Sequence, residues 1–313
     1  MNHTKHLDVV VAGLALADII GRPVDLRRPP KSGTLKLIDS ITLTTGGNVS
    51  NVGIDLAKLG FRVGAVTRVG NDSIGRFVLR HYKTFGIDTE GVIIDARAQT
   101  AATIVSVDAD GERTFLHTRG CMKNFRAGDL LGRIPYLQKT SILAIGYLGL
   151  LPETEKDFPH LFSTLKAKTS LKIFLDTAAS PRVTPKALRE FLPYVDYFVP
   201  SYEEAVLITG KKAPEAIVDT FLRAGAPHVV GVKLAAQGCY LSDGTQAEFV
   251  KGKRVRRVVD ATGAGDAFVA GFIAATVRGL DPFRAARVAN AVAASCVCAV
   301  GASTAIKPFE EYL

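Results

Sequence analysis

Several motifs that would assign a function at once are missing from this 313-residue sequence. No G-x-x-x-x-G-K-[ST] stretch is present, which excludes a P-loop, and Gly263-Ala264-Gly265 lacks the third glycine of a dinucleotide fingerprint. The longest late apolar run, around 291–302, is too short to span a bilayer. No C-x-x-C pair occurs among the four cysteines, which are Cys121, Cys239, Cys296 and Cys298. We therefore expect a cytoplasmic protein with reduced, buried thiols, no zinc site and no membrane partner.

A signal peptide is not expected either. The apolar stretch VVVAGLALA (9–17) ends in an Ala-x-Ala pattern that is similar to a cleavage site. Asp8 precedes it, however, Asp18 follows at once, and only one lysine comes before it. A first β-strand that leads into a loop fits this pattern better.

Short β-rich apolar runs alternate with helical patterns along most of the chain. The expected strands are 8–14, 62–70, 141–148, 171–177, 195–201, 228–234 and 238–243. The expected helices are 49–59, 73–84, 154–167, 185–191, 202–209 and 214–224. Because the strands are apolar on both faces, they predict a mainly parallel sheet flanked by helices, in a doubly wound α/β fold. We expect one domain over residues 1–313, since 47% hydrophobic residues can build a large core.

Two segments, at about 20–45 and 99–118, break this alternation. They contain extended stretches that alternate with polar residues and cannot easily join a buried parallel sheet. The second segment reads as a hairpin that turns at Asp110-Gly111. We predict that the two segments form a small antiparallel layer beside the main domain.

The stretch TTGGNVSNVGIDLAKLG (44–60) has a helical pattern with glycines and amides at its start. Asn48 or Ser50 can cap such a helix, and Gly60 can end it. Capping leaves the pair Gly46-Gly47 and Asn51 unexplained. Glycines let a ligand contact the backbone, and amides offer the donors and acceptors that suit sugar hydroxyls. The stretch fits either a well-capped helix or a sugar-binding turn.

A second glycine-rich stretch, VVDATGAGDAFVAGF (258–272), predicts an anion site. Valines 258 and 259 are expected to end a strand, and 267–277 is expected to be a buried helix. The turn at 263–265 then brings unpaired N–H groups and the positive end of the helix dipole together. Asp266 would lie beside this turn and can take a proton from an attacking hydroxyl, while Asp260 can bind a cation. The alternative is that Asp266 only stabilises the helix dipole.

These two stretches resemble the signatures of the ribokinase-like carbohydrate kinases, or PfkB family. DATGAGDAFVAGF is similar to the D-T-x-G-A-G-D signature, with Ala261 where threonine is common, and GGNVSNVGIDLAKLG to the glycine-asparagine signature. Asp18, VGNDSIGRF (69–77) and GVKLAAQGCYL (231–241) match in order and spacing. The resemblance runs essentially from end to end.

The resemblance implies a β-sheet lid, often used for dimerisation, and phosphoryl transfer from ATP with Mg²⁺, often activated by a monovalent cation such as K⁺. The catalytic residues would be the base Asp266 and an anion hole of Gly263, Ala264 and Gly265. The acceptor would be bound by Asp18, Gly46, Gly47, Asn48 and Asn51. The nucleotide would lie near Lys233, Gly238, Gly263, Gly265 and Asn290. Glu204 would act on magnesium through water, and Asp260 with the carbonyls near Ala299 and Gly301 would bind the monovalent cation.

Two departures from the family pattern qualify the resemblance. PSYEEA (200–205) keeps the acidic Glu204 but has Ser201 where asparagine is usual, which leaves the metal arrangement open. IGYLG (145–149) lacks the glutamate that ribokinases use for the sugar, so membership of the wider family is favoured over strict ribokinase activity.

The leading hypothesis is an ATP-dependent kinase of a free sugar or sugar acid, and the acceptor itself stays open. A nucleoside kinase would need an apolar pocket, for which Phe115, Phe125 and Tyr147 are possible walls. A phosphosugar kinase would need basic groups facing the acceptor, for which Arg113 and Arg119 are the candidates. A catalytically silent binding protein is disfavoured by the intact Asp266 turn.

The net charge of +9 favours anionic ligands in general. The basic run KGKRVRR (251–257) contains no aromatic residue, and we place it on the strand before the glycine-rich turn. We interpret it first as a solvated strand edge and second as a means of attracting ATP. Nucleic acid is not an expected partner.

Overall fold

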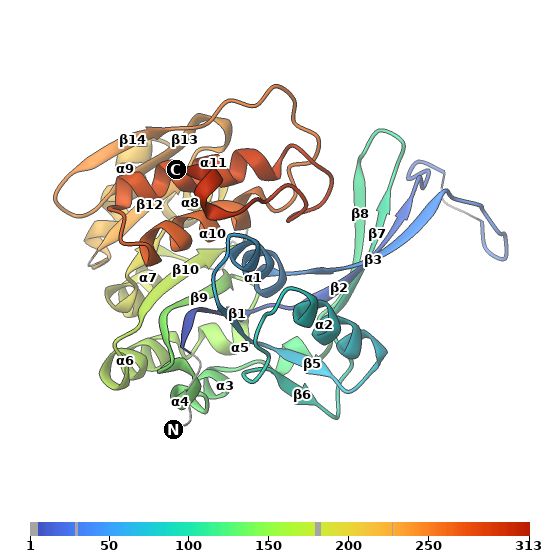
Figure 1. Cartoon of the computed structure of the whole chain (residues 1–313), viewed down its shortest axis with the longest axis horizontal. Helices are drawn as coiled ribbons and strands as arrows, with labels where there is room; N and C mark the ends of the chain where they lie inside the picture. The colour runs from blue at the N-terminus through green and yellow to red at the C-terminus, as the bar shows by residue number, and fades with distance from the viewer. Residues whose placement is uncertain (1–5, 29–30, 179–182, 227) are drawn as a thin grey trace.

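The computed structural model describes residues 6–28, 31–178, 183–226 and 228–313 (Figure 1). A large sheet forms the body, and a smaller sheet projects from one side of it. The large sheet has the spatial order β14 (Ala247–Lys251), β13 (Gly238–Ser242), β12 (Val229–Lys233), β11 (Tyr197–Phe198), β10 (Lys172–Thr177), β9 (Thr140–Leu148), β1 (Leu7–Gly13), β4 (Val63–Val66). All neighbours from β12 to β4 pair in parallel, and β13 and β14 add an antiparallel edge. The predicted doubly wound fold is confirmed.

Helices cover both faces of the large sheet, which explains why its strands are apolar throughout. Val9 and Val11 of β1 enter one core, whereas Val10 and Ala12 enter the other. The first core lies under α1 (Asn48–Lys58), α2 (Ser73–Thr84), α10 (Ala264–Val277) and α11 (Pro282–Cys296). The second lies under α3 (Ala127–Leu131), α4 (Ile134–Leu137), α5 (Pro152–Glu155), α6 (Phe158–Lys168), α7 (Pro185–Phe191), α8 (Tyr202–Thr209) and α9 (Pro214–Arg223).

The smaller sheet, here called the lid, has the order β3 (Ser40–Gly46), β2 (Leu16–Arg22), β7 (Ala102–Val107), β8 (Arg113–Thr118). The hairpin predicted at Asp110-Gly111 is present, because β7 and β8 pair in antiparallel fashion and Gly111 has φ of 89°. The prediction of an entirely antiparallel layer was wrong in one respect, since β2 and β7 pair in parallel. Their parallel pairing requires the long connection between them, which passes through α1 and α2.

Three details differ from the expected strands and helices. Val258 and Val259 belong to no strand; they are 58% and 47% exposed in a loop, so the basic run 251–257 leaves the sheet after β14. The expected strand 62–70 is divided into β4 and β5 (Arg68–Gly70), and β5 pairs with β6 (Ile93–Asp95). The expected helix 154–167 is divided into α5 and α6, where Pro159 lies in the first turn of α6 and favours a new helix start.

Short 3-10 turns complete the described chain: η1 (Gly120–Asn124), η2 (Leu192–Tyr194), η3 (Ala235–Gln237) and η4 (Phe309–Tyr312). Cys121, Cys239 and Cys296 are buried free thiols as expected, but Cys298 is exposed. Among the described residues, none of the helices has the length and apolar character needed to cross a membrane.

Candidate active site

Two helices, α1 and α10, begin near the carboxyl end of β9, where three polar side chains meet. Asp266 lies in the first turn of α10 and is buried, with 7% exposed. The side-chain amide of Asn51, in α1, donates to Asp266 Oδ2 at 2.9 Å. The hydroxyl of Tyr147, in β9, lies 2.9 Å from both carboxylate oxygens. Neutral donors from two other elements therefore fix the orientation of the Asp266 carboxylate.

The pKa of Asp266 is raised to about 6, mainly by burial and next by the charge of Asp176. Hydrogen bonds from Asn51 and Tyr147 and the charge of Lys233 act in the opposite direction. At neutral pH the Asp266 carboxyl group is mostly ionised, yet its pKa is close enough to the surrounding pH for the carboxylate to accept a proton. A general base requires this combination.

The turn before α10 presents bare backbone, as the sequence predicts. Gly263 is the N-cap of α10 with φ of 79°, and a Cβ there would lie 2.4 Å from the Cβ of Ala302. A Cβ on Gly265 would lie 3.6 Å from Lys233 Nζ, so an ammonium group borders the turn. The helix N-terminus and Lys233 together make a site that suits an anion next to Asp266.

Lys233, at the end of β12, belongs to a buried charged cluster that the sequence predicted only in part. Its Nζ lies 3.0 Å from Oδ1 of Asp176, near the end of β10. Burial opposes the charge of Lys233, but Asp176 and Glu204 outweigh it and raise the lysine pKa above its ordinary value. Glu204 Oε2 accepts from the backbone N–H of Ser201 at 3.0 Å and from the hydroxyl of Thr177.

Ser201 explains how the departure from the family pattern is accommodated. It is the N-cap of α8, its hydroxyl accepts from the backbone N–H of Glu204, and Glu204 completes a capping box. Serine caps a helix as well as asparagine does. The carboxylate of Glu204 is therefore held at the carboxyl end of the sheet beside Asp176.

The start of α1 shows different roles for its two asparagines. Asn48 is buried, its Oδ1 accepts from the N–H of Leu14, and its Nδ2 donates to the carbonyl of Ala12, both at 2.8 Å. Backbone groups bond to both ends of the Asn48 amide, which gives this side chain a structural role, and the direct contact with the acceptor expected for Asn48 stays a prediction. Gly47 has φ of 85°, and a Cβ there would lie 2.3 Å from the carbonyl oxygen of Leu14.

On the lid, the strand register brings the predicted Asp18 to the same face as three polar residues that the sequence analysis did not name. Asp18 pairs with Thr44 and Thr103, and Thr103 pairs with His117. Burial raises the pKa of Asp18, and a hydrogen bond with Thr103 opposes this shift. A Cβ on Gly46 would lie 2.4 Å from Asp18 Oδ2, so glycine leaves room for this carboxylate.

Arg113 lies at the start of β8 and reaches from the lid to the loop before α10. Its Nη2 donates to Asp260 Oδ1 at 2.9 Å, and its Nη1 to the hydroxyl of Thr262. Asp260 Oδ2 accepts from the N–H of Gly301 at 3.0 Å, and Ala299 lies in the same loop. Burial opposes ionisation of Asp260, but bonds from Thr262, Gly301 and Arg113 lower its pKa to about 2.

Two of the residues expected near the nucleotide, Gly238 and Asn290, lie at the antiparallel edge of the large sheet. Gly238 begins β13 with φ of 112°, and a Cβ there would lie 2.1 Å from the carbonyl oxygen of Val250. Asn290, in α11, is buried, and its amide donates to the carbonyls of Val250 and Lys251 at 3.1 and 3.3 Å. Asn290 thus ties α11 to the end of β14.

Sequence reasoning assigned no role to Asp176, and it considered Tyr147 only as a possible pocket wall. A polar residue at the carboxyl end of a buried parallel strand was the available signal, because ligands bind at that edge of open α/β sheets. Phe125 is 1% exposed in the core and cannot wall a pocket, whereas Phe115 lies 59% exposed on the lid. Arg119 is exposed immediately before η1, and its charge helps burial to lower the pKa of His117 on the lid.

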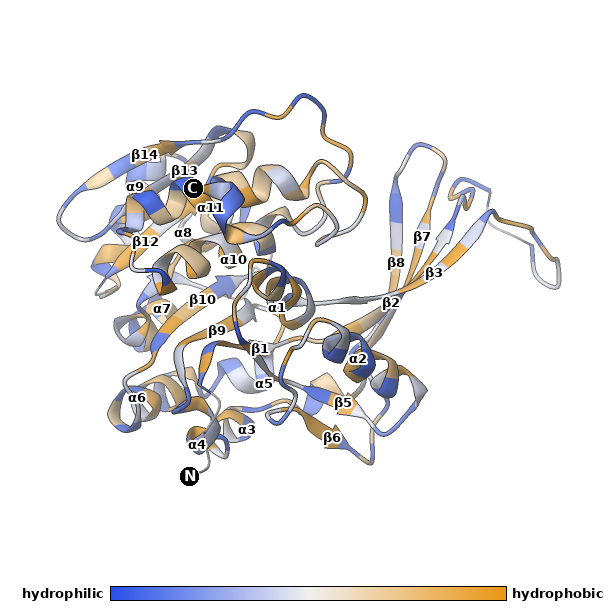
Figure 2. Cartoon of the chain, in the orientation of Figure 1, coloured by the Kyte–Doolittle hydropathy of each residue, from blue (hydrophilic) through white to orange (hydrophobic). Residues whose placement is uncertain are grey.

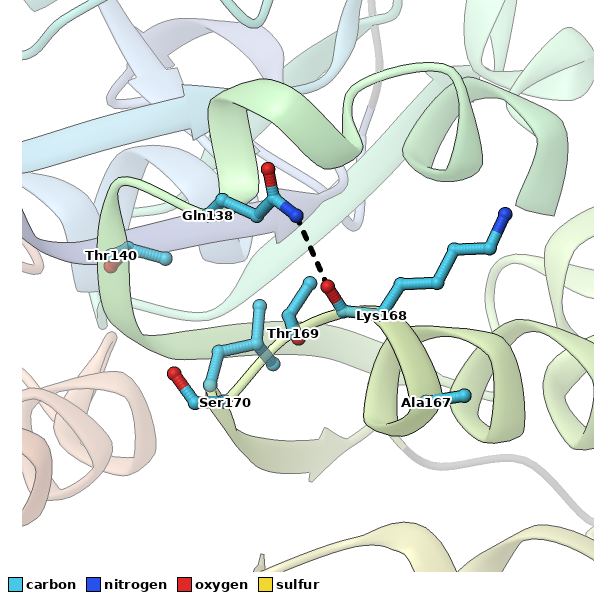
Figure 3. A pocket seen from close by; sticks show the side chains of 7 residues that line it. Gln138, Thr140, Ala167, Lys168, Thr169 and Ser170 are labelled. Atoms are coloured by element: carbon cyan, nitrogen blue, oxygen red, sulfur yellow. Dashed lines mark hydrogen bonds between the residues drawn. The ribbon is translucent and has the colours of Figure 1, made fainter.

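A shallow cavity of about 410 Å³ lies elsewhere, beside the amino ends of β9 and β10 (Figure 3). Gln138 and Lys168 line it, and the Gln138 side-chain amide donates to the Lys168 carbonyl at 3.1 Å. The opposite edge of the sheet carries the polar cluster described above. We therefore place the candidate site at the carboxyl ends of the strands.

A doubly wound sheet with a poised carboxylate beside an anion-binding turn is typical of a phosphotransferase. Comparison with known proteins agrees with this class. Residues 6–308 match the model of the pfkB family carbohydrate kinases, and the chain belongs to that family.

Individual relatives and structures are consistent with the family. The chain is 33% identical over 283 residues to 2-dehydro-3-deoxygluconokinase of Bacillus subtilis, covering 86% of this chain and 85% of that protein. The structure of Arabidopsis thaliana ribokinase with ribose and ATP matches with a TM-score of 0.83 at 24% identity, covering 98% and 97% of the two chains. A putative ribokinase II from E. coli, in complex with ATP and Mg²⁺, matches with a TM-score of 0.81 at 22% identity, again covering 98% and 97%.

Proposed function

We propose that this carbohydrate kinase transfers the γ-phosphoryl group of ATP to a hydroxyl of a sugar or sugar acid, with Asp266 as the general base. The observation that carries the proposal is the Asp266 carboxylate, held by Asn51 and Tyr147 next to the turn at Gly263–Gly265. Its pKa of about 6 suits proton transfer at neutral pH.

In the proposed step, Asp266 removes the proton from the acceptor hydroxyl as its oxygen attacks the γ-phosphorus. The bond between the γ-phosphorus and the bridging oxygen breaks, and ADP leaves with the electron pair. Negative charge on the transferred group is stabilised by the N–H groups at Gly263, Ala264 and Gly265 and by the nearby Lys233. Electrostatic stabilisation of this kind is usually the largest contribution to phosphoryl transfer.

The acceptor is assigned to the space between the lid and the start of α1. Asp18 and Asn51 are the proposed direct ligands, while Gly46 and Gly47 allow close approach to the backbone. Asn48 is assigned a supporting role, because its amide holds the end of β1. The relative named 2-dehydro-3-deoxygluconokinase favours a sugar acid, and the ribokinase relatives favour a free sugar.

The nucleotide is assigned to the side of Lys233, Gly238, Gly263, Gly265 and Asn290. The residues present fit magnesium as well, because Asp176 and Glu204 place two carboxylates beside Lys233 at the carboxyl edge of the sheet. Magnesium would neutralise phosphate charge there, with Glu204 acting through water. A cytoplasmic location stays a prediction, whereas the K⁺ expected at Asp260, Ala299 and Gly301 is not part of the proposed mechanism, because Arg113 already donates to Asp260.

A homodimer formed through the lid is also proposed, and the register of the lid strands supports it. Leu43 pairs with Ile19, Ile19 with Ile104, and Ile104 with Leu116. Directly paired residues share a face, so these four residues, here called the apolar row, cross the whole sheet. Leu43, Ile104 and Leu116 are 46%, 51% and 68% exposed. Figure 2 shows hydrophobic segments on β2 and β3, which project from the body.

A panel of sugars, sugar acids and nucleosides, assayed for ADP release with ATP and Mg²⁺, tests the proposed activity. We expect turnover with a sugar or sugar acid, and the phosphorylated product should be visible by phosphorus NMR. Preference for a nucleoside would favour the alternative within the same fold. Absence of turnover on the whole panel, with ATP binding retained, would favour a silent binding protein.

A further inference from the structure

The ion pair between Arg113 and Asp260 joins two parts of the chain that are 147 residues apart. Arg113 belongs to the lid, whereas Asp260 and Thr262 precede the anion turn of α10. The Asp260 side chain is 8% exposed and that of Arg113 is 33% exposed, so the pair is shielded on the carboxylate side. In the structure, the lid is therefore bound directly to the loop that leads into the proposed anion hole.

The hydrogen bonds of Asp260 leave little capacity for another ligand. Oδ1 accepts from the N–H and hydroxyl of Thr262 at 2.9 and 2.7 Å and from Arg113 at 2.9 Å, and Oδ2 accepts from the N–H of Gly301. Oδ1 therefore has three donors for about two acceptor positions, whereas Oδ2 has one donor and keeps one position. A monovalent cation at Oδ1 would have to displace a donor, and a cation at Oδ2 would be repelled by the guanidinium charge of Arg113, so the cation predicted from the family does not fit this arrangement.

We propose that Arg113 is a positioning residue whose guanidinium group takes the place of a monovalent cation at Asp260 when the lid is closed. This inference rests on the proposed function. Lid closure brings the positive charge to Asp260, and the same guanidinium holds Thr262, whose neighbour Gly263 caps α10. The anion turn is thereby ordered by closure of the lid over the acceptor, without a bound ion.

Arg113 also differs from the residues that would contact the acceptor. Its Nη atoms donate to Thr262 and Asp260, so the guanidinium faces this loop, and the contact with the acceptor expected for Arg113 stays a prediction. Removing Arg113 should therefore impair the step that depends on the anion turn more than the binding of the acceptor.

The test compares wild type, Arg113→Met and the control Arg27→Met at constant ionic strength, with K⁺ replaced stepwise by tetramethylammonium. Arg27 is also a lid arginine, but its side chain is 87% exposed. We expect K⁺ to leave wild-type kcat unchanged. Arg113→Met should lower kcat by up to about 10²-fold, because a displacement of about 1 Å at the anion turn can have an effect of this size, and K⁺ should restore part of it. Arg27→Met should behave as wild type.

A second measurement does not depend on turnover. Amide hydrogen exchange at 260–266 and 299–303 should be faster in Arg113→Met than in wild type, and K⁺ should slow it only in the variant. The proposal is overturned if wild-type kcat and exchange both respond to K⁺, or if Arg113→Met leaves both unchanged. If no acceptor is phosphorylated, the proposed function fails, and the exchange data still decide whether Arg113 orders this loop.

Discussion

The hydroxyl of Tyr147 lies 2.9 Å from both carboxylate oxygens of Asp266. A neutral donor shared between the two oxygens stabilises the ionised carboxylate without cancelling its charge. Asn51 adds a further bond to one oxygen. The buried acid therefore keeps a pKa near 6, and its state depends on two side chains that can be changed singly.

Replacing Asp266 with asparagine should separate its chemical role from its structural one. Asp266→Asn keeps the shape of the side chain but cannot accept the proton, so kcat should fall by about 10²–10⁴-fold. ATP affinity should hold or increase, because one negative charge near the phosphates is gone. Stability should change by about 0.3–1 kcal/mol, the usual contribution of a first-turn carboxylate. Turnover within a few-fold of wild type would show that Asp266 is not the base.

The pH dependence of kcat/KM should report the ionisation of Asp266. The base must be deprotonated, so with its pKa at about 6 activity should be lost as the pH falls below that value. Tyr147→Phe removes a bond that lowers this pKa, so the acid limb should move to higher pH. Tyr82→Phe is the matched control, because Tyr82 is buried and bonds with Ser50. If the acid limb of the pH profile stays at the same pH in Tyr147→Phe, the assignment of this limb to Asp266 would be contradicted.

The two asparagines of α1 should differ in what they support. Asn48→Ala strands the N–H of Leu14 and the carbonyl of Ala12, at a cost of about 1–3 kcal/mol for each buried group. Asn51→Ala should change stability little but lower kcat/KM for the acceptor, while ATP affinity is retained. Chemical denaturation and steady-state kinetics on both variants make the comparison. Equal effects of the two substitutions on stability and kinetics would refute the division of roles.

Asp55, in α1, should make the protein less stable as the pH rises. Asp55 is fully buried, and burial outweighs the stabilisation of its ionised form by the nearby Ser303 and Lys58. Burial raises its pKa well above the ordinary value, so the folded state favours the neutral acid. Stability from this group is present below the unfolded pKa and is lost as the pH rises through the folded pKa. Asp55→Asn should thus be more stable at neutral pH by about 1–3 kcal/mol, with the gain disappearing near pH 4. Melting temperatures of both proteins between pH 4 and 8 test this.

The apolar row should hold the dimer together. Leu116→Asp places a charge at the β8 end of the apolar row, so sedimentation should show the monomer where wild type is dimeric. Leu207→Asp is the control, because Leu207 is 55% exposed on α8, away from the lid. A wild-type monomer at high concentration would disprove the lid dimer, as would a dimer that both variants leave intact.

Much of this architecture could be predicted because local signals agreed with the fold. The boundaries of α7 and α8 follow from a Thr184 cap and a Ser201 cap, and the glycine turn before α10 follows from small residues next to an apolar helix. The hairpin turn at Asp110-Gly111 could be predicted in the same way, from its Asp-Gly pair. Where caps and turns are encoded locally, sequence is sufficient.

The rest depended on contacts between distant segments. The partners of Tyr147 and Arg113 lie 119 and 147 residues away, and no local pattern indicates either pair. Asn48 and Asn51 look equivalent in sequence, yet one faces backbone and the other faces Asp266. Val258 and Val259 have high strand propensity, but no neighbouring strand is available to pair with them, so tertiary context overrides propensity.

Only Leu14 and Ala15 separate β1 of the body from β2 of the lid, and Asn48 holds Leu14 in place. The acceptor-facing surface and the phosphoryl-transfer groups therefore come from separate stretches of chain that meet at a two-residue junction. Under the proposed function, substitutions on the acceptor-facing side of the lid, near Asp18, should alter which sugar is accepted while α10 keeps its chemistry, whereas substitutions at Arg113 should affect both. Acceptor preference could therefore change during evolution while the groups that transfer the phosphoryl group stay the same.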